Sequence, residues 1–510
     1  MPRWLFAPVI ANRTRAGVTA GLWSALAFLA GCTGRAPVTF AAVVEPPVRL
    51  TIVQLNDVYE ITSLSGGKWG GPARVATLLQ RLEQQNPNTI AVLAGDFLSP
   101  SALGTATVDG SRLDGRQMVD VLNAMGLDYV TIGNHEFDLR ETALLERLRE
   151  SRFQWISSNV TLASGAALPG VVSHVIVRAR HGADSLRVGL IGVTMDRDQP
   201  AYARIADPFT ATTARVEALR DSIDVLVAIT HLPIAQDVSL VDRVPAIDLI
   251  IGGHEHENML LRRGEDLTPI AKADANARTV WVHDVTWHPS TRQAAIGSRL
   301  VAITDSIPDD PATAAVAERW VEAAFDAFRS AGFEPSEVVA NVPVELDGLE
   351  SVVRNRSTEL TQLIVDAMRA EAGTAGAVVN SGSIRIDDVL SPGPLTQYDI
   401  IRILPFGGPV VEIEVTGSLL VRILDQGLQN RGGGGFLQLS GIERSNNAWL
   451  LGGQSIEGTR RYRIAVSDFL LTGREQGLSF LTRENPELAV IRELRDVRQA
   501  LIAEARRRWT

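Results

Sequence analysis

Five short polar motifs in the first half of the chain contain the side chains best suited to bind metal ions or to move protons. They are Asn-Asp-Val-Tyr at 56–59, Gly-Asp at 95–96, Gly-Asn-His-Glu at 133–136, Thr-His at 230–231 and Gly-Gly-His-Glu-His at 252–256. Their carboxylate, amide and imidazole groups are donors that suit Zn, Mn, Fe or Mg. Each motif alone could be a cap or a satisfied polar residue at the end of a strand. Taken together, they indicate a metal site.

Each motif follows an apolar stretch that has the length and composition of a buried strand. Strands are predicted at 50–55, 90–94, 128–132, 188–193, 225–229 and 247–251. Amphipathic helices are predicted between several of them, for example at 73–83 and 118–125. This alternation is typical of an α/β layered domain, in which ligands bind beyond the carboxyl ends of the strands. We therefore expect the five motifs to converge on one site.

The composition is that of an ordinary globular protein. A length of 510 residues predicts two or three domains, each with its own core. With 45% hydrophobic and 21% charged residues, the chain is neither collagen-like, wholly disordered nor a polytopic membrane protein. The formal net charge of −10 gives no attraction for nucleic-acid backbones, so no nucleic-acid partner is expected.

The single cysteine, Cys32, is explained by its position near the N-terminus. It follows Leu-Ala-Gly and an apolar run at 16–30, which is preceded by three arginines and no acidic residue. This pattern indicates a secretory signal peptide, and Leu-Ala-Gly-Cys resembles the lipobox of bacterial lipoproteins. An ordinary secretory signal with an incidental cysteine is the alternative. We expect secretion across the inner membrane, lipidation of Cys32, and attachment to the membrane through this anchor alone, at the periplasmic or outer-membrane face.

The five motifs resemble those of the calcineurin-like metallophosphoesterases, and most of all their 5'-nucleotidase branch. The matching stretches are Asp-Val-Tyr, Gly-Asp-Phe, Gly-Asn-His-Glu-Phe-Asp, Thr-His and Gly-Gly-His-Glu-His. The resemblance implies a four-layer αββα domain and two divalent metal ions that share Asp96. The remaining ligands would be Asp57 and His256 for one ion, and Asn134, His231 and His254 for the other. Zn, Mn, Mg, Co and Fe all stay open as the metal.

The resemblance also assigns roles in catalysis. His135 would not be a ligand but would stabilise the transferring phosphoryl group or the leaving oxygen, and Asp138 would orient it. An imidazolium beside a carboxylate stays charged near neutral pH, so the pairing is chemically reasonable. Two ions about 3.5–4 Å apart can bind a phosphate oxygen and promote in-line attack by a metal-bound hydroxide.

Tyr59 departs from the family pattern, which has histidine two residues after the first aspartate. A phenol is a poor ligand for Zn or Mg at neutral pH, although a phenolate binds Fe(III) well. Tyr59 could therefore be a ligand, or it could pack beside the site. If the preceding strand continued, Glu60 would face the opposite way.

The second half resembles the 5'-nucleotidase C-terminal domain, which narrows the class of substrate. Residues 380–385 match an Asn-x-Gly-x-Ile-Arg loop, which contributes Asn380 and Arg385. Arg354 lies ahead of a helix predicted at 361–371 and would be a second substrate contact. An arginine can form two hydrogen bonds at once to phosphate or ribose oxygens. Solvated arginines at these positions are the alternative.

Two phenylalanines and one glutamate complete the proposed nucleotide pocket. Phe406 and Phe469 occupy the positions of a pair that sandwiches the nucleobase in the family, and stacking of this kind accepts any flat base. Ordinary core positions for both rings are the alternative. Glu475 lies in Gly-Arg-Glu-Gln-Gly, where the family usually has Gly-Gly-Asp-Gly, and it could replace the aspartate. The glycines at 432–435 are interpreted as a flexible loop.

These patterns predict an α/β protein with five segments along the chain. They are a signal peptide at 1–31, a tether at 32–48, a metallophosphoesterase domain at 49–305, a linker helix at 306–335 and a substrate-binding domain at 336–510. The expected activity releases phosphate from 5'-nucleotides, and nucleotide sugars or 2',3'-cyclic nucleotides are further candidate substrates. The alternatives are the same dimetal chemistry on another phosphoester or on a sulfur-transfer intermediate, and a non-catalytic lipoprotein that binds nucleotide.

Overall fold

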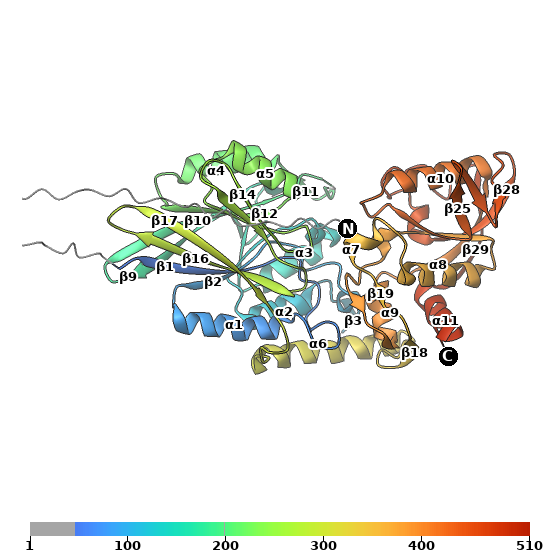
Figure 1. Ribbon diagram of the computed structural model, residues 1–510, viewed down its shortest axis with the longest axis horizontal. Coiled ribbons are helices and arrows are strands. Elements are labelled where there is room, and N and C mark those ends of the chain that lie inside the picture. The colour runs from blue at the N-terminus through green and yellow to red at the C-terminus, as the bar shows by residue number, and fades with distance from the viewer. Residues whose placement is uncertain (1–45, 198, 510) are drawn as a thin grey trace, which may run out of the picture. The chain divides into compact units, whose positions relative to one another are not determined.

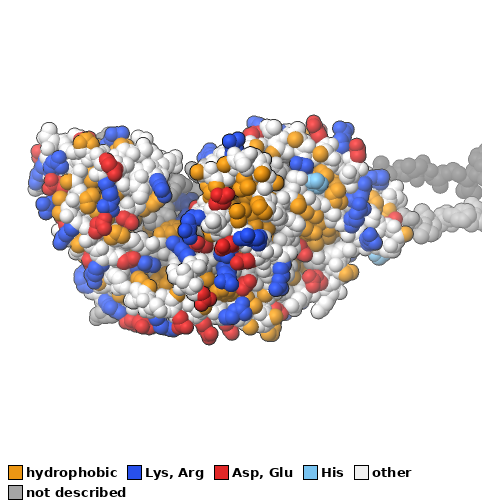
Figure 2. Space-filling view, turned by 180° about the vertical axis from the view of Figure 1, so that it is seen from behind, with side chains coloured by type: hydrophobic (Ala, Val, Ile, Leu, Met, Phe, Trp, Pro, Cys, Tyr) orange, Lys and Arg blue, Asp and Glu red, His pale blue; other side chains and the backbone are white. Residues whose placement is uncertain are grey.

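The computed structural model describes residues 46–197 and 199–509, which belong to one compact unit. Cys32 and the signal peptide expected at 1–31 lie outside the described residues, as does most of the tether expected at 32–48. Within the described part, every helix is too short or too polar to span a bilayer. Basic and acidic side chains are interspersed on the face drawn in Figure 2, so this face has no large field of one sign.

The first sheet has seven strands and ends in three of the polar motifs (Figure 1). Its strand order is β17 (Gln293–Ala302), β16 (Thr279–His288), β1 (Val48–Leu55), β2 (Thr89–Leu93), β5 (Tyr129–Thr131), β6 (Gln154–Ile156) and β8 (Val171–Val172). The five strands from β1 to β8 are parallel, so their carboxyl ends share one edge. The strands predicted at 50–55, 90–94 and 128–132 are confirmed to within two residues at each end.

The second sheet has six strands and carries the other two motifs. Its order is β14 (Met259–Arg263), β15 (Thr268–Lys272), β13 (Leu249–Gly252), β12 (Val225–His231), β10 (Asp184–Thr194) and β9 (His174–His181). β10, β12, β13 and β15 are parallel. The strand predicted at 188–193 is four residues longer at its start, because β10 forms a hairpin with β9. His231 is the last residue of β12 and does not follow the strand as predicted.

The two sheets pack face to face between two layers of helices. Leu50 and Ile52 of β1 point into the core between the sheets, whereas Val53 and Leu55 point to the outer helices, as the period of two requires. The first sheet is covered by α1 (Pro72–Gln85), α2 (Arg116–Met125), α3 (Glu141–Glu150) and α6 (Pro311–Ser330), and the second by α4 (Pro208–Leu219) and α5 (Ile234–Arg243). The four-layer αββα prediction is confirmed.

The helix expected as a linker at 306–335 is α6, and it packs on the outer layer of the first half. The indole nitrogen of Trp320 donates to Asp120 of α2 at 3.1 Å. The ring of Phe325 also lies 4.9 Å from that of Tyr398 in the second half. Because α6 contacts both halves, the domain limits given above stay a prediction.

The second half is built on a five-stranded mixed sheet with helices on both faces. The strand order is β24 (Leu437–Ser440), β20 (Gly376–Asn380), β28 (Arg461–Ser467), β23 (Pro409–Thr416) and β29 (Leu488–Asp496). One face packs on α10 (Gly417–Gln429), and the other on α8 (Glu359–Ala372) and α11 (Val497–Trp509). The helix predicted at 361–371 is therefore confirmed as part of α8, which begins at a capping box formed by Thr358 and Thr361.

Shorter elements connect these layers and form much of the site. The short helices are α7 (Glu350–Val353), α9 (Gln397–Ile403), and the 3-10 turns η1 (Leu103–Thr105), η2 (His135–Asp138), η3 (Ser381–Ser383) and η4 (Asp468–Leu471). The short strands are β3 (Thr107–Val108), β4 (Ser111–Arg112), β7 (Val160–Leu162), β11 (Ala203–Ile205), β18 (Val338–Val342), β19 (Leu346–Asp347), β21 (Val389–Leu390), β22 (Gly393–Thr396), β25 (Ile442–Ser445), β26 (Ala448–Leu451) and β27 (Gln454–Ser455).

A buried ion pair joins the two halves close to the site. The Nε of Arg402, in α9, donates to Glu60 Oε1 at 3.0 Å, and both side chains are buried. The continuing strand that would have turned Glu60 the opposite way does not form, because β1 ends at Leu55. Glu60 leaves the strand edge to meet the second half.

Candidate active site

Three of the predicted ligands form a buried cluster where the two sheets meet. Asp57 follows β1, Asp96 follows β2 and His231 ends β12, and each offers a ligand atom within 4.8 Å of the others. His231 Nε2 lies 3.0 Å from Asp96 Oδ2. All three residues are at most 1% exposed. Such a concentration of carboxylate and imidazole groups away from water requires a positive charge among them.

A backbone carbonyl fixes the orientation of His231. Its Nδ1 lies 2.7 Å from the carbonyl oxygen of Ala94 and donates to it, which directs Nε2 toward Asp96. The side-chain oxygen of Asn134 lies 3.1 Å from the same Nε2. Although burial opposes protonation, the carboxylate of Asp96 raises the pKa of His231 to about 9. The pocket therefore attracts a cation, and its electron-pair donors fit a divalent metal.

Tyr59 and His256 extend this cluster on the side of Asp57. His256 Nε2 lies 3.4 Å from Asp57 Oδ1. The hydroxyl of Tyr59 lies 3.2 Å from His256 Nε2, 3.3 Å from Asp96 Oδ2 and 3.4 Å from Asp57 Oδ1. Burial, followed by the nearby carboxylates, raises the pKa of Tyr59 well above its usual value, which favours the protonated phenol. Tyr59 is thus at the centre of the site, and its role as a ligand stays a prediction.

His254 lies beside the cluster. Its backbone N–H donates to Asp57 Oδ2 at 3.0 Å, and its ring centre is 5.5 Å from that of His231. Burial, followed by the charge of His231, lowers the pKa of His254 to about 3. A neutral imidazole is the form that binds a metal ion.

The backbone around these ligands is strained and closely packed. Asp57, Asp96 and His254 have φ angles of 53°, 58° and 82°, in a region that residues other than glycine seldom adopt. Gly133 passes so close to Asp96 that a Cβ atom would lie 2.1 Å from Asp96 Oδ1. A Cβ atom on Gly253 would lie 2.8 Å from His231 Nδ1. The glycines of the motifs are therefore needed to bring the strand ends together.

Glu136 holds the backbone of the motif loops through hydrogen bonds, a role that the sequence did not indicate. Its carboxylate accepts the backbone N–H groups of Asp96, Phe97, Leu98 and Gly133, at 2.7 to 3.1 Å. Burial, followed by the charge of Asp96, raises the pKa of Glu136 to about 7. Its place within the Gly-Asn-His-Glu motif was the available signal, because a charged residue beside a buried strand end needs partners.

Lys272 supports the His254 loop in a similar way and was also missed. Its fully buried ammonium donates to the carbonyl of Gly253 at 2.7 Å and pairs with Asp237 Oδ2 at 2.9 Å. It also contacts Glu255. A lone lysine in the apolar strand β15 was the only sequence signal.

His135 and Asp138 are paired as the sequence predicted. His135 Nδ1 lies 2.8 Å from Asp138 Oδ2, which also accepts the hydroxyl of Ser99 at 3.0 Å. The backbone N–H of His135 donates to Asp96 Oδ1 at 2.8 Å, which places the pair directly beside the cluster. The imidazole is thus held by a carboxylate at the edge of the candidate metal site.

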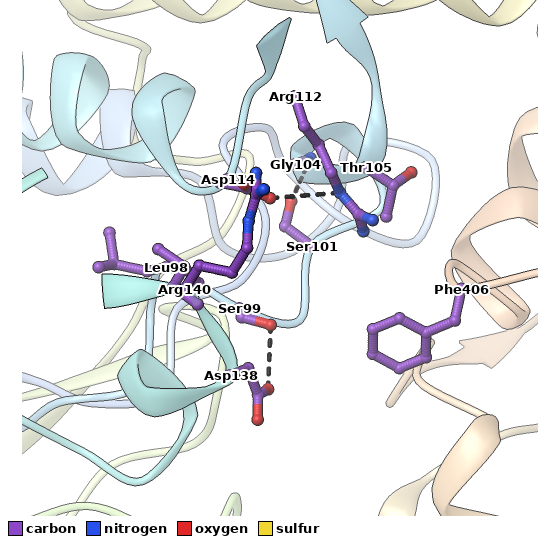
Figure 3. A pocket seen from close by; sticks show the side chains of 11 residues that line it. Leu98, Ser99, Ser101, Gly104, Thr105, Arg112, Asp114, Asp138, Arg140 and Phe406 are labelled. Atoms are coloured by element: carbon purple, nitrogen blue, oxygen red, sulfur yellow. Dashed lines mark hydrogen bonds and ion pairs between the residues drawn. The ribbon is translucent and has the colours of Figure 1, made fainter. Parts of the chain in front are cut away.

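A cavity of about 380 Å³ lies next to this pair and includes a residue of the second half. Its lining contains Ser99, Arg112, Asp138, Arg140 and Phe406. Figure 3 shows the ring of Phe406 facing the pocket across from Asp138 and Arg112. Phe406 is 52% exposed and Phe469 is 39% exposed, so neither ring is a core residue. Phe469 does not line this cavity.

The two predicted arginines meet at a residue that the sequence did not indicate, Glu350. Arg354 Nη1 lies 2.5 Å from Glu350 Oε1, and Arg385 Nη1 lies 3.7 Å from Glu350 Oε2. A second cavity of about 420 Å³ is lined by Glu350 and Arg354 together with His254, His256 and Asp387. The arginines are therefore paired inside the molecule and are not solvated surface residues.

The Asn380 loop is held by the residue predicted to support it. Asn380 Nδ2 donates to Glu475 Oε2 at 2.8 Å, and Ser383 donates to Asn380 Oδ1 at 2.7 Å. The backbone N–H of Gly382 donates to the carbonyl of Gly434 at 2.7 Å. The glycine stretch at 432–435, interpreted above as a flexible loop, is hydrogen-bonded to this loop and to the carbonyl of Arg354.

Comparison with known protein families matches two separate stretches of the chain, one in each half. The family described as calcineurin-like phosphoesterase matches residues 50–258, and the family described as 5'-nucleotidase, C-terminal domain, matches residues 338–482. The chain belongs to the 5'-nucleotidase-like metallophosphoesterases. Members of this class are metal-dependent phosphoesterases, and the buried Asp57, Asp96 and His231 cluster is compatible with a metal site.

Relatives of this metallophosphoesterase resemble it over most of its length. It is 26% identical over 448 residues to the trifunctional nucleotide phosphoesterase protein YfkN of Bacillus subtilis, covering 77% of this chain and 29% of that longer relative. It is 26% identical over 473 residues to the 5'-nucleotidase of Homo sapiens, covering 80% of this chain and 78% of the human protein.

Two solved structures from Thermus thermophilus share the fold. A 5'-nucleotidase precursor matches with a TM-score of 0.73 at 22% identity, over 90% of this chain and 97% of that one. The sulfate thiohydrolase SoxB matches with a TM-score of 0.68 at 14% identity, over 90% and 94%. The metallophosphoesterase described here shares its arrangement of layers with both, and the fold does not distinguish between their substrates.

Proposed function

We propose that the chain releases phosphate from 5'-nucleotides at a centre of two divalent metal ions. The observation that carries this proposal is the convergence of Asp57, Asp96 and His231 in a buried cluster beside the His135–Asp138 pair. Nucleotide sugars and 2',3'-cyclic nucleotides are proposed as further substrates of the same chemistry. Zn, Mn, Mg, Co and Fe all remain candidates, because oxygen and nitrogen donors suit each of them.

The ligands of the two ions come from strand ends of both sheets. Asp96 would be shared, with Asp57 and His256 on one side and Asn134, His231 and His254 on the other. When bound, such a pair of ions supplies a nucleophile near neutral pH and neutralises charge that develops on phosphate oxygens. Tyr59, among these residues, would donate a hydrogen bond to a carboxylate ligand or bind the first ion itself.

His135 is proposed to stabilise the transferring phosphoryl group or the leaving oxygen. Its Nδ1 is engaged by Asp138, so its Nε2 is the atom left to donate to substrate. The carboxylate keeps the ring in one orientation. Ser99 limits the rotation of that carboxylate through its own hydrogen bond.

The second half is proposed to bind the rest of the nucleotide. Arg354 and Arg385 would form hydrogen bonds to phosphate or ribose oxygens in place of their contacts with Glu350. Phe406 and Phe469 would stack on the base, because both rings are exposed. The two segments that carry these rings lie close together, since a Cβ atom on Gly408 would lie 2.6 Å from Asp468 Oδ1. Asn380, held by Glu475, would contact the substrate between them.

The test is hydrolysis of a nucleotide panel by purified protein supplied with each candidate metal. Asp96→Ala should reduce turnover by at least about 10²- to 10³-fold, because it removes the shared ligand. Asp305→Ala, which changes an exposed carboxylate, serves as the control and should keep full activity. Nucleotide hydrolysis that survives in Asp96→Ala would refute the mechanism. Faster turnover of a phosphodiester or a sulfur ester would favour the alternative substrates.

We also propose that the chain acts outside the cytoplasm, tethered through a lipid on Cys32. The support is the lipobox-like Leu-Ala-Gly-Cys sequence and the charge of nucleotides, which prevents them from crossing a bilayer unaided. A Cys32→Ala chain should be released from the membrane fraction, and one that stays bound would contradict the anchor.

A further inference from the structure

Two histidines at the site are each held by a carboxylate in the same geometry. His135 Nδ1 lies 2.8 Å from Asp138 Oδ2, and His256 Nδ1 lies 2.8 Å from Asp387 Oδ2. The first pair spans three residues of one turn. The second joins residues 131 positions apart, one in the stretch that matches the phosphoesterase family and one in the stretch that matches the C-terminal domain.

Asp387 is firmly placed for this contact. It is 7% exposed, and its Oδ1 accepts the backbone N–H of Glu350 at 2.8 Å, which leaves Oδ2 for His256. Its φ angle of 40° lies in the left-handed region, which is costly for a residue other than glycine and persists only when surrounding contacts enforce it.

The contacts that enforce it come from the first half. Arg278, beyond β15, donates to the backbone carbonyl of Asp387 at 3.1 Å and to Asp388 Oδ1 at 2.7 Å. The hydroxyl of Ser65 donates to the same Asp388 oxygen at 3.1 Å. The segment at 387–388 is thus fixed to the half of the molecule that holds His256.

The hydrogen bond determines what His256 presents to the candidate metal site. The carboxylate accepts the Nδ1 proton, so in the neutral ring the lone pair is on Nε2, which lies 3.4 Å from Asp57 Oδ1. Carboxylates in this position orient a ligating histidine and increase its basicity, and their loss costs about 10- to 100-fold in metal affinity. The Tyr59 hydroxyl, which belongs to the phosphoesterase side, lies 3.2 Å from the same Nε2.

We propose that Asp387 is a positioning residue through which the second half completes the metal site of the first. The inference rests on the metal centre of the proposed function, and it does not depend on the substrate. Binding of an ion at His256 and docking of the 387–388 segment would then be coupled. Because such coupling is reciprocal, each should strengthen the other by the same factor.

The test compares Asp387→Asn with Asp138→Asn, which removes the matching carboxylate from a histidine that is not a ligand. Both full-length variants, stripped with a chelator, are titrated with Mn²⁺ by calorimetry and by electron paramagnetic resonance. Asp387→Asn should weaken one of the two binding events by about 10- to 100-fold. Asp138→Asn should bind Mn²⁺ like the unaltered chain while losing turnover. Equal Mn²⁺ affinity in Asp387→Asn and the unaltered chain would overturn the inference.

Two further measurements separate this outcome from its alternatives. The thermal unfolding midpoint of chelator-treated Asp387→Asn should match that of the unaltered chain. If it does not, the Mn²⁺ titration is repeated with Arg278→Gln, which loosens the 387–388 segment without changing His256 or Asp387. Mn²⁺ should slow hydrogen exchange at the 387–389 amides in the unaltered chain and not in Asp387→Asn; the same slowing in both would count against the coupling. Unaltered protein that binds two ions but releases no phosphate from nucleotides would refute the proposed function alone.

Discussion

Phe406 extends an exposed ring from the second half into the cavity beside Asp138. An aromatic ring that is half exposed loses contact with water only when a partner covers it, and a flat nucleobase is such a partner. The guanidinium carbon of Arg385 lies 6.0 Å from the centre of this ring, close enough for a favourable electrostatic contact. At the scale of single residues, the candidate base contact at Phe406 and the candidate phosphate contact at Arg385 are thus adjacent but chemically different.

Replacing Phe406 should therefore affect nucleotides more than simple phosphate esters. Phe406→Ala removes a stacking contact worth about 1–3 kcal/mol, so KM for a nucleoside monophosphate should rise by about 5- to 150-fold. The value of kcat/KM for a small aryl phosphate should change little, because that substrate has no base to stack. Steady-state kinetics on both substrates, with Phe469→Ala in parallel, provide the measurement. An equal loss on both substrates would show that the ring supports the site in another way.

Sequence reasoning found the residues whose chemistry is contained in a motif and missed those that depend on distant partners. Asp57, Asp96 and His231 could be identified because each lies just beyond the end of a predicted strand. Glu350 and Asp387 could not, because their roles depend on contacts with residues far along the chain. No local pattern encodes such a contact, since it is produced only when the two halves pack together.

At the scale of the elements, the ends of the strands could be predicted, because an apolar run shows where a buried strand lies and a glycine shows where the chain turns. Burial on both faces explains the continuous apolar runs of β2, β12 and β13. The end of β1 at Leu55 agrees with the predicted strand, and the chain then turns so that Glu60 meets Arg402 of the second half. Periodicity alone does not predict where such a turn leads, because tertiary contacts impose it.

Gly133 offers a test of how these edges support the ligands. Gly133→Ala would place a Cβ atom 2.1 Å from Asp96 Oδ1 and 2.7 Å from the Asp96 backbone nitrogen, so the shared ligand must move. We expect turnover to fall by about 10²-fold, the effect of a displacement near 1 Å. Gly297→Ala in β17 is the matched control, because no atom lies within 4 Å of its added Cβ. The measurements are the metal content and the turnover of both variants. Normal activity in Gly133→Ala would show that the backbone at the strand end can shift without displacing Asp96.

For the whole molecule, buried charges take part in the contact between the halves together with a shared apolar cluster. Arg402 pairs with Glu60 of the first half and lies 3.5 Å from Asp388 and 3.6 Å from Asp399 of the second. A buried pair contributes little net stability, but breaking one by removing a single partner leaves an uncompensated charge. Removing one member of this group should therefore disturb the contact between the halves.

Replacing Arg402 should accordingly lower the stability of the protein. Replacing Glu60 as well should restore part of that stability. Arg402→Met should lower the free energy of unfolding by about 3–5 kcal/mol, because Glu60 stays buried without its partner. The double variant Glu60→Gln, Arg402→Met should recover a substantial part of that stability. Urea denaturation of the single and double variants measures both values. Additive losses in the double variant would contradict a specific pairing.

The hydrogen bond from His231 to the carbonyl of Ala94 has a consequence for how this protein can evolve. The donor belongs to one sheet and the acceptor to the other, so the direction of a candidate metal ligand follows the spacing and twist between the sheets. Apolar residues such as Ile229 and Val92, which fill that space, should therefore influence the direction of this ligand without lining the candidate site. If the proposed activity is under natural selection, drift should be restricted in this interior layer as well as in the polar motifs.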